Sequence, residues 1–278
     1  MRILLFGHRG QLGSALMNAL PASHSLISPD IDITDDVQLR NIIISTLPDI
    51  IINAAAYTNV DGAETESERA FAVNTYAPRL MAKLAKENNI RLVHYSTDYV
   101  FDGTGNRPWN ERDLPHPMNI YGQSKWEGEQ YIIESGCQHL IFRTSWVYGA
   151  GHKNFITQII QMAKVKDEIK VISNQIGAPT SARFLAESTY HAIQQESGHG
   201  LYHLCCAGET SWYHYAQKII SCFVPQSGCR IIPVTSDLYA QKAQRPLNSR
   251  LNCNRFINDF GLSPPDWEAE FMLNKHLF

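Results

Sequence analysis

Long hydrophobic runs are absent from this 278-residue sequence, and their absence excludes a membrane-spanning helix. Its apolar runs, such as Ile42–Ile44 and Ile50–Ile52, fall far short of the roughly 18 residues that a span requires. The apolar residues 2–6 are likewise too few for the core of a signal peptide. We therefore expect a cytoplasmic protein that has no membrane partner.

An excess of positive charge is also missing, which argues against nucleic acid as a partner. The 24 lysines and arginines are balanced by 27 aspartates and glutamates, so the formal net charge at pH 7 is −3. A protein that binds a phosphate backbone or an anionic lipid surface usually presents a basic field. The composition therefore predicts no nucleic-acid partner.

Paired cysteine motifs are the third absence. No C-x-x-C pair occurs, and no cysteine lies at zinc-like spacing from a histidine. Adjacent Cys205 and Cys206 would point to opposite faces of a strand. We expect the cysteines to be buried, reduced thiols of a reducing compartment, and they lie at positions 137, 205, 206, 222, 229 and 253.

Short β-rich runs alternate with longer helical stretches in the first half of the chain. Strands that are separated by a dozen or more helical residues are expected to pair in parallel. The expected strands cover residues 2–6, 25–29, 48–55, 90–97 and 139–149, and the helices cover 11–20, 35–46, 64–87 and a segment from 121. The pattern predicts an α/β fold with a doubly wound parallel sheet of the Rossmann type.

The alternation becomes less regular beyond Gly149. Two helices, over 152–165 and 184–196, and two strands, over 200–205 and 230–234, are expected there. We therefore divide the chain into two predicted domains. Residues 1–149 form a dinucleotide-binding domain to which later segments return, and residues 150–278 form mostly a smaller, discontinuous substrate-binding lobe.

Three glycines follow the first strand and open the first helix, as Gly7-x-x-Gly10-x-x-Gly13. Such glycines allow a tight turn and let backbone N–H groups at the helix N-terminus approach a pyrophosphate. Asp30 ends the second strand, where a carboxylate can accept hydrogen bonds from the adenosine ribose and favour NADH. Arg9 lies inside the loop and could instead meet the 2′-phosphate of NADPH. The sequence therefore predicts NADPH or NADH and leaves the preference open.

A hydroxyl, a phenol and an ammonium group are expected at the ligand crevice. Thr97 ends the fourth strand, and the carboxyl ends of parallel strands face the crevice in this architecture. Tyr121 and Lys125 are four residues apart, so they share one helix face. Because an ammonium group favours a neighbouring phenolate, we expect Lys125 to lower the pKa of Tyr121 towards the working pH.

With these motifs the sequence resembles the extended short-chain dehydrogenases/reductases, which share the glycine loop, the strand-end Ser/Thr and the Tyr-x-x-x-Lys pair. In finer detail it is similar to the dTDP-4-dehydrorhamnose reductases over nearly its whole length. The segments that carry this resemblance are ILLFGHRGQLG, IINAAAYTNVD, HYSTDYVFDG, YGQSK, LIFRTSWVYG, GAPT, RPLNSRL and PDWEAEF. The resemblance implies that hydride passes from the nicotinamide to the C4 ketone of dTDP-4-dehydro-β-L-rhamnose and yields dTDP-L-rhamnose.

The resemblance also implies roles for individual residues. Tyr121 would protonate the emerging alkoxide, Lys125 would tune it and hold the nicotinamide ribose, and Thr97 would donate to the carbonyl oxygen. Arg245 is a candidate to pair with the substrate pyrophosphate through its planar fork. Positions that match the family's nucleotide contacts are Gln11, Leu12, Asp30, Asp32, Ile33, Ala55, Ala56, Tyr57 and Tyr95. Positions that match its sugar-nucleotide contacts are Thr97, Asp98 and Trp146.

Two positions depart from the family pattern. Some members carry a glutamate two residues after the third glycine and another after GAPT, and these help to bind Mg²⁺ at a dimer contact. Ala15 and Arg183 occupy those positions here, and neither a methyl group nor a guanidinium can ligate a hard cation. We therefore expect no metal, and either a monomer or a weak homodimer.

Two alternatives share this fold. The first is a reductase or epimerase of another 4-keto sugar nucleotide. A dehydratase is disfavoured because Tyr99 stands where the Thr-Asp-Glu motif of the dehydratases has its glutamate. The second alternative is a non-catalytic regulatory subunit, since the regulatory β subunit of methionine adenosyltransferase resembles the same family. The intact Thr97, Tyr121 and Lys125 favour catalysis.

Overall fold

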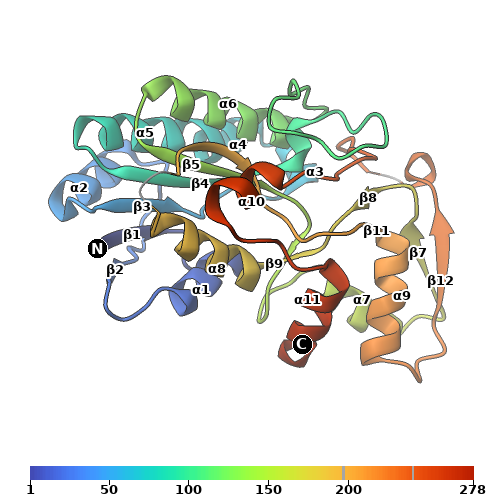
Figure 1. The fold of residues 1–278 in the computed structure, drawn as a ribbon. Helices are drawn as coiled ribbons and strands as arrows, with labels where there is room; N and C mark the ends of the chain where they lie inside the picture. The colour runs from blue at the N-terminus through green and yellow to red at the C-terminus, as the bar shows by residue number, and fades with distance from the viewer. Residues whose placement is uncertain (196–197, 240) are drawn as a thin grey trace.

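A parallel sheet of six strands forms the centre of the protein in the computed structural model, which describes residues 1–195, 198–239 and 241–278 (Figure 1). The strand order is β10-β5-β4-β3-β1-β2, and neighbouring strands are parallel. The predicted α/β fold with a doubly wound sheet is confirmed. The strands are β1 (Arg2–Phe6), β2 (Ser25–Ile27), β3 (Ile50–Asn53), β4 (Arg91–Thr97), β5 (His139–Thr144) and β10 (Gly200–His203).

Helices cover both faces of this sheet (Figure 1). Alternate residues of β1 belong to two separate cores, since Ile3 and Leu5 pack on one face and Leu4 and Phe6 on the other. Burial on both faces explains why the central strands are continuous apolar runs in the sequence. One face carries α1 (Gln11–Ala19) and α8 (Ala182–Ile193), and the other carries α2 (Asp36–Thr46), α5 (Ala77–Glu87) and α6 (Ile120–Ser135).

The strand order places the ligand crevice. The chain winds outwards in both directions from β1 and β3, which are neighbours in the sheet. In open α/β sheets the crevice lies beyond the carboxyl ends of the strands at such a switch point. The glycine loop follows β1 at this edge, and Thr97 lies at the same edge of the sheet, at the end of β4.

A smaller lobe lies to one side of the sheet (Figure 1). Its strands β7 (Glu168–Ile172) and β12 (Arg230–Val234) pair in parallel, and α7 (Phe155–Ala163) and α9 (Trp212–Phe223) pack beside them. The short elements are α3 (Val60–Ala63), η2 (Asp98–Val100), β6 (Val147–Tyr148), β8 (Ile176–Gly177), β9 (Thr180–Ser181), β11 (Thr210–Ser211), η3 (Ser236–Leu238), α10 (Asn254–Phe260), α11 (Trp267–Asn274) and η4 (Lys275–Leu277).

The helix predicted over 64–87 is interrupted. α4 (Ser67–Phe71) passes into a π-helical turn, η1 (Ala72–Tyr76), before α5 begins. In that turn the buried Asn74 amide donates to the Tyr57 carbonyl oxygen at 3.1 Å and to Ser124 Oγ of α6 at 3.0 Å. A proline in the first turn of α5 lacks an N–H group, which suits this change of helical hydrogen bonding.

The strand predicted over 139–149 is also broken. β5 ends at Thr144, and Trp146 then adopts a φ of 48°, an unusual conformation for a large side chain, before β6 begins. The helix predicted over 184–196 is α8, which ends at Ile193, and position 196 lies outside the described residues. The sequence patterns did not predict β7, α9, α10 or α11.

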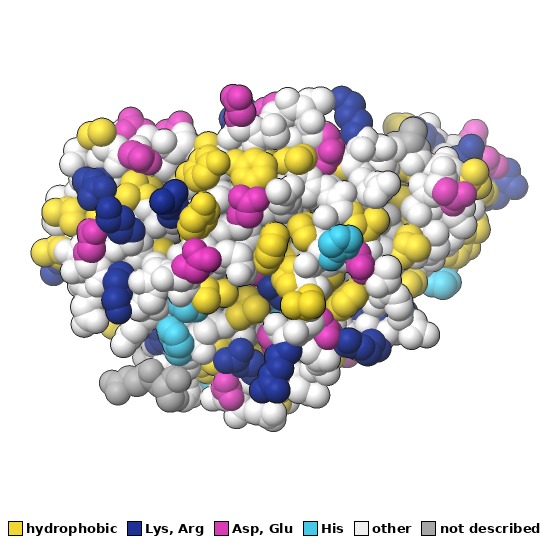
Figure 2. Space-filling model, turned by 90° about the horizontal axis from the view of Figure 1, so that it is seen from above, with side chains coloured by type: hydrophobic (Ala, Val, Ile, Leu, Met, Phe, Trp, Pro, Cys, Tyr) yellow, Lys and Arg dark blue, Asp and Glu magenta, His cyan; other side chains and the backbone are white. Residues whose placement is uncertain are grey.

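Charge on the outside of the protein is mixed. On the face shown in Figure 2, lysine and arginine side chains are interspersed with aspartate and glutamate, so neither sign dominates that face. This distribution agrees with the nearly balanced composition. Among the helices in the described ranges, none has the length and apolar character needed to cross a membrane.

Candidate active site

Two glycines of the loop between β1 and α1, Gly7 and Gly13, have no room for a side chain. Gly7 adopts a φ of 81°, and a Cβ atom there would lie 2.5 Å from the backbone nitrogen of Ala55. A Cβ atom on Gly13 would lie 2.0 Å from the Gly7 carbonyl oxygen. Gly10 caps α1 without any side-chain hydrogen bond, so the amide groups of this helix N-terminus can bind an anion.

A cleft of about 220 Å³ lies beside this loop. The Arg9 guanidinium lies 2.5 Å from the Asp30 carboxylate in this cleft, and both side chains are exposed. Asp32 accepts hydrogen bonds from the N–H and the hydroxyl of Thr34, and these bonds hold the pKa of Asp32 below its usual value. The cleft thus offers both a cation and carboxylates to a ligand. The predicted cofactor residues that line it are Gly7, Asp30, Asp32, Ile33, Ala55 and Ala56.

Other predicted cofactor residues make different contacts. Gln11 Oε1 accepts from the backbone N–H that follows β6 at 2.7 Å, and Leu12 packs against the core. The Tyr57 N–H donates to an asparagine side chain of η1 at 2.9 Å. The Tyr95 phenol is buried and lies 2.7 Å from Thr189 Oγ1 of α8, so this side chain points into the core on the face opposite α6.

The end of β4 meets the start of α6. Thr97 Oγ1 donates to Asp98 Oδ1 at 3.1 Å and accepts from the Tyr99 N–H at 3.2 Å. Asn119 caps α6 by accepting a backbone N–H of its first turn at 2.7 Å, which places Tyr121 in that turn. The Tyr121 phenol lies close enough to Thr97 for this hydroxyl to lower its pKa. The structure therefore brings the predicted proton donor and the predicted carbonyl-binding hydroxyl together.

The pKa of the Tyr121 phenol is raised, not lowered. Burial raises this pKa to about 12, the neighbouring Thr97 hydroxyl opposes the rise, and the nearby Asp98 carboxyl adds to it. The prediction that Lys125 lowers the pKa of Tyr121 is wrong, because the lysine head group instead points towards β4 and binds the Tyr95 carbonyl oxygen. A phenol with such a pKa stays protonated near neutral pH, as a proton donor must.

Lys125 is buried beneath the site. Its Nζ donates to the Tyr95 carbonyl oxygen at 2.5 Å and lies 3.2 Å from His94 Nε2. Burial lowers the pKa of Lys125 to about 8, and the charge of Glu129 opposes this shift. His94 was not predicted as a site residue. Neighbouring residues of a strand face opposite sides of a sheet. Because Tyr95 faces α8, His94 had to face α6, the helix that carries Lys125.

Asp98 occupies the first position after β4. Burial raises its pKa to about 7, so the carboxyl group exists in both protonation states near neutral pH. Within the described residues its Oδ2 atom is buried and has no hydrogen-bond partner. Ser249 and Thr97 lie close enough to this carboxyl group to oppose the rise of its pKa. The sugar contact of Asp98 stays a prediction.

The remaining predicted substrate residues are held by other side chains. Both terminal nitrogens of Arg245 donate to the Asp61 carboxylate, at 2.8 and 3.2 Å, so its planar fork is engaged within the protein. The indole of Trp146 stacks on Trp212 with ring centroids 3.7 Å apart, which covers one of its faces. Trp212 was not predicted as a site residue. It lines a cleft of about 380 Å³ together with Asp61, Tyr99, Phe155 and Arg245.

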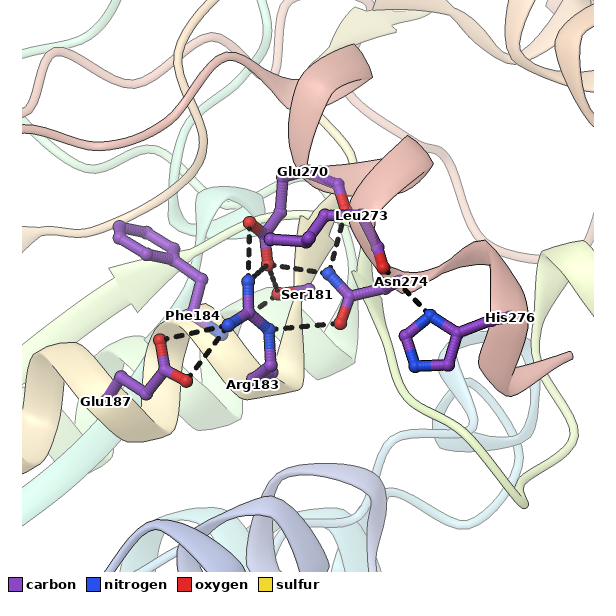
Figure 3. Close-up of polar contacts among 8 residues, drawn as sticks. All are labelled: Ser181, Arg183, Phe184, Glu187, Glu270, Leu273, Asn274 and His276. Atoms are coloured by element: carbon purple, nitrogen blue, oxygen red, sulfur yellow. Dashed lines mark hydrogen bonds and ion pairs between the residues drawn. The ribbon is translucent and has the colours of Figure 1, made fainter.

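Arg183, one of the two positions that depart from the family pattern, lies in a polar network between α8 and α11 (Figure 3). Its guanidinium donates to both oxygens of Glu270 at 3.0 and 3.1 Å, to Glu187 at 3.0 Å and to Asn274 Oδ1 at 3.0 Å. The positive charge next to Glu270 is therefore supplied by the Arg183 guanidinium. In the part of the chain that the structure describes, no group of three His, Cys, Asp or Glu side chains could hold a metal ion.

The fold and the site together define a class of protein. A doubly wound parallel sheet, a glycine loop after its first strand, and a Thr, Tyr and Lys at the carboxyl edge are the features of the extended short-chain dehydrogenases/reductases. The family model of the RmlD substrate binding domain matches residues 1–275. The chain belongs to this family, that of the dTDP-4-dehydrorhamnose reductases.

Individual relatives support this assignment. The dTDP-4-dehydrorhamnose reductase of Escherichia coli K12 is 41% identical over an alignment that covers 99% of this chain and 98% of the relative. A crystal structure of the Bacillus anthracis reductase in complex with NADP has a TM-score of 0.93 at 34% identity and covers 98% and 97% of the two chains. The Clostridium acetobutylicum reductase has a TM-score of 0.94 at 32% identity and covers 100% and 99%.

Proposed function

We propose that this chain reduces the C4 ketone of dTDP-4-dehydro-β-L-rhamnose to dTDP-L-rhamnose with NADPH or NADH, a step in the synthesis of a polysaccharide precursor. The observation that carries the proposal is the meeting of Thr97 and Tyr121 at the end of β4, on the same edge of the sheet as the glycine loop. The names of the relatives and the NADP complex of a structural neighbour support the same reaction.

The protein fits a nicotinamide cofactor. Glycines 7 and 13 allow the close backbone packing of this turn, Gly10 leaves the start of α1 exposed to a pyrophosphate, and Asp30 and Arg9 lie in the cleft beside them. When bound, the cofactor supplies hydride to the substrate carbon. The chain contributes the Thr97 hydroxyl, which gives up its hydrogen bond to Asp98 and donates to the carbonyl oxygen, and the Tyr121 phenol, which gives that oxygen its proton. Lys125 holds the cofactor ribose in this proposal.

The remaining parts of the proposal concern the lobes and the setting of the protein. The nucleotide domain comprises residues 1–149 and the later segments that return to it, such as β10 beside β5. The smaller lobe, drawn mostly from residues 150–278, holds the sugar nucleotide. Because Ala15 offers no ligand and the Arg183 guanidinium is bound to Glu270, we propose a cytoplasmic monomer or weak homodimer without a bridging metal.

A direct assay tests the reaction. Purified protein mixed with NADPH or NADH and dTDP-4-dehydrorhamnose is expected to oxidise the nicotinamide, which is followed by its absorbance. NMR of the product is expected to show dTDP-L-rhamnose. Formation of a different sugar nucleotide would identify another reductase or an epimerase. Tight binding to a second protein without oxidation would favour the regulatory alternative.

The choice between the two cofactors should depend on Asp30. In Asp30→Ala the carboxylate that would bind the adenosine ribose is lost, and Arg9 is released from its pair with Asp30. A hydrogen bond to a charged group contributes about 1.5–3 kcal/mol, so the KM for NADH should rise about tenfold or more while that for NADPH changes less or falls. Steady-state kinetics with both cofactors measure this. Equal changes in the two KM values would contradict the assignment.

A further inference from the structure

A chain of buried polar groups runs through the sheet behind the site. Asn53 of β3 lies beside His94 of β4 in the register of the two strands, and its Nδ2 is 3.1 Å from His94 Nδ1. His94 Nε2 is 3.2 Å from Lys125 Nζ, which also donates to the Tyr95 carbonyl oxygen. The side chains of Asn53, His94 and Lys125 are 1%, 0% and 2% exposed, so water does not share these contacts.

The backbone of the β3 loop fixes the direction of these hydrogen bonds. Asn53 Oδ1 accepts the Ala55 N–H at 3.2 Å, which means that the other end of the amide, the Nδ2 donor, faces His94. His94 Nδ1 must therefore accept. In a neutral imidazole that accepts at Nδ1 the proton is on Nε2. Burial lowers the pKa of His94 well below its usual value, which keeps the ring neutral.

The Nε2–H group of His94 then points at Lys125. A neutral amine has one lone pair and can accept this hydrogen bond while it donates to the Tyr95 carbonyl oxygen. An ammonium group has no lone pair, so its N–H would meet the N–H of His94. Since an unsatisfied buried donor costs about 1–3 kcal/mol, the pattern of donors favours the neutral amine.

The other charged groups near Lys125 do not reverse this preference. On α6, Glu129 favours the ammonium, but its carboxylate is bound by Arg143 of β5 through hydrogen bonds of 2.9 and 2.6 Å. From η1, the groups that contact α6 beside the lysine are the neutral side chains of Asn74 and Thr75. On η2, Asp98 raises the pKa of Tyr121 and is not among the causes of the Lys125 shift.

We propose that His94 is a positioning residue which, oriented by Asn53, favours the neutral form of Lys125. The inference rests on the proposed function.

The tautomer of His94 can be measured without any catalysis. In protein labelled with ¹⁵N-histidine, long-range ¹H–¹⁵N NMR distinguishes the two tautomers of each ring, and the signals absent from His94→Gln assign the residue. We expect the proton of His94 on Nε2. We also expect these signals to report a pH titration of Lys125 near or below about 8, instead of near the usual 10.4. A proton on Nδ1 in the unchanged protein would overturn the proposal.

Asn53→Asp tests the link to Lys125. The new carboxylate keeps an acceptor for the Ala55 N–H and places a second acceptor opposite His94 Nδ1, so the ring proton should move there. His94 Nε2 would then accept from the ammonium, and the pKa of Lys125 should rise by about one unit or more, a tenfold change in its acid constant. The matched control is Asn258→Asp on the exposed surface of α10, which adds the same charge far from the buried chain.

Two measurements on Asn53→Asp decide the outcome. The tautomer spectrum should switch to Nδ1–H, and the apparent pKa in the pH dependence of kcat should move upwards, while both stay unchanged in Asn258→Asp. A switched tautomer with an unchanged apparent pKa would overturn the role of His94. Absence of nicotinamide oxidation in the unchanged protein would refute the proposed reaction alone, because the NMR titration of Lys125 reports the buried chain independently.

Discussion

Replacement of Tyr121 by phenylalanine is expected to reduce kcat for carbonyl reduction by about 10²–10⁴, the usual contribution of a general acid. The substitution keeps the ring, and with it the edge-on contact with Tyr99 at 5.7 Å, but removes the only hydroxyl that this side chain can offer the substrate oxygen. The raised pKa of the phenol, about 12, means that the lost group is a protonated donor over the whole neutral range.

The affinity of Tyr121→Phe for NADPH shows whether a lower kcat reflects the missing proton donor or a disturbed fold. In Tyr121→Phe the Kd of NADPH, measured by its fluorescence, should stay nearly unchanged because the glycine loop and the cleft beside it are intact. Tyr76→Phe is the matched control, since it removes a hydroxyl from a tyrosine that is 52% exposed on η1. Its kcat should equal that of the unchanged protein. An unaltered rate in Tyr121→Phe would show that another group is the acid.

Removal of the Glu129 carboxylate is expected to destabilise the folded protein strongly. Glu129 of α6 and Arg143 of β5 form a two-point ion pair, at 2.9 and 2.6 Å, and their side chains are 0% and 2% exposed. Removing one member of a buried pair leaves the other charge without compensation, which costs about 3–5 kcal/mol. Glu129→Gln should therefore lower the free energy of unfolding by about this amount.

Urea unfolding measures this change, and an exposed pair supplies the control. Lys83 and Glu87 on α5 lie 3.9 Å apart at the surface, with 63% and 49% of their side chains exposed. Solvent screens such a pair, so Glu87→Gln should change the free energy of unfolding by at most about 1 kcal/mol. Equal and small losses in both variants would show that the Glu129–Arg143 pair adds little to stability.

The sequence correctly predicted those helices, strands and loops whose formation depends on residues close together in the chain. The β1–loop–α1 unit was predicted because glycine spacing and strand-to-helix order are properties of a dozen consecutive residues. The shared helix face of Tyr121 and Lys125 follows from helical periodicity alone. The short helix α11 was missed although Asp266 caps it by accepting from two backbone N–H groups, because prolines nearby obscured its start.

Contacts between residues far apart in the chain determine the pKa values and the partners of the site side chains. The phenol of Tyr121 has a raised pKa because it is buried, and the Lys125 head group turns towards β4; neither fact is visible in the spacing of the two residues. The stacking of Trp146 on Trp212 joins residues far apart in the chain. Likewise, the Asp61 carboxylate that holds Arg245 lies 184 positions away in sequence.

The sequence by itself determined the class of fold, the dinucleotide loop, and the identities of the residues proposed for the chemistry, because these depend on short-range periodicity and on which side chains are present. Only the tertiary structure decided their ionisation and their partners. The charge state of a side chain depends on how much water surrounds it and on which donors and acceptors face it. In Lys125 and His94, those neighbours come from strands and helices that fold together from separate parts of the chain.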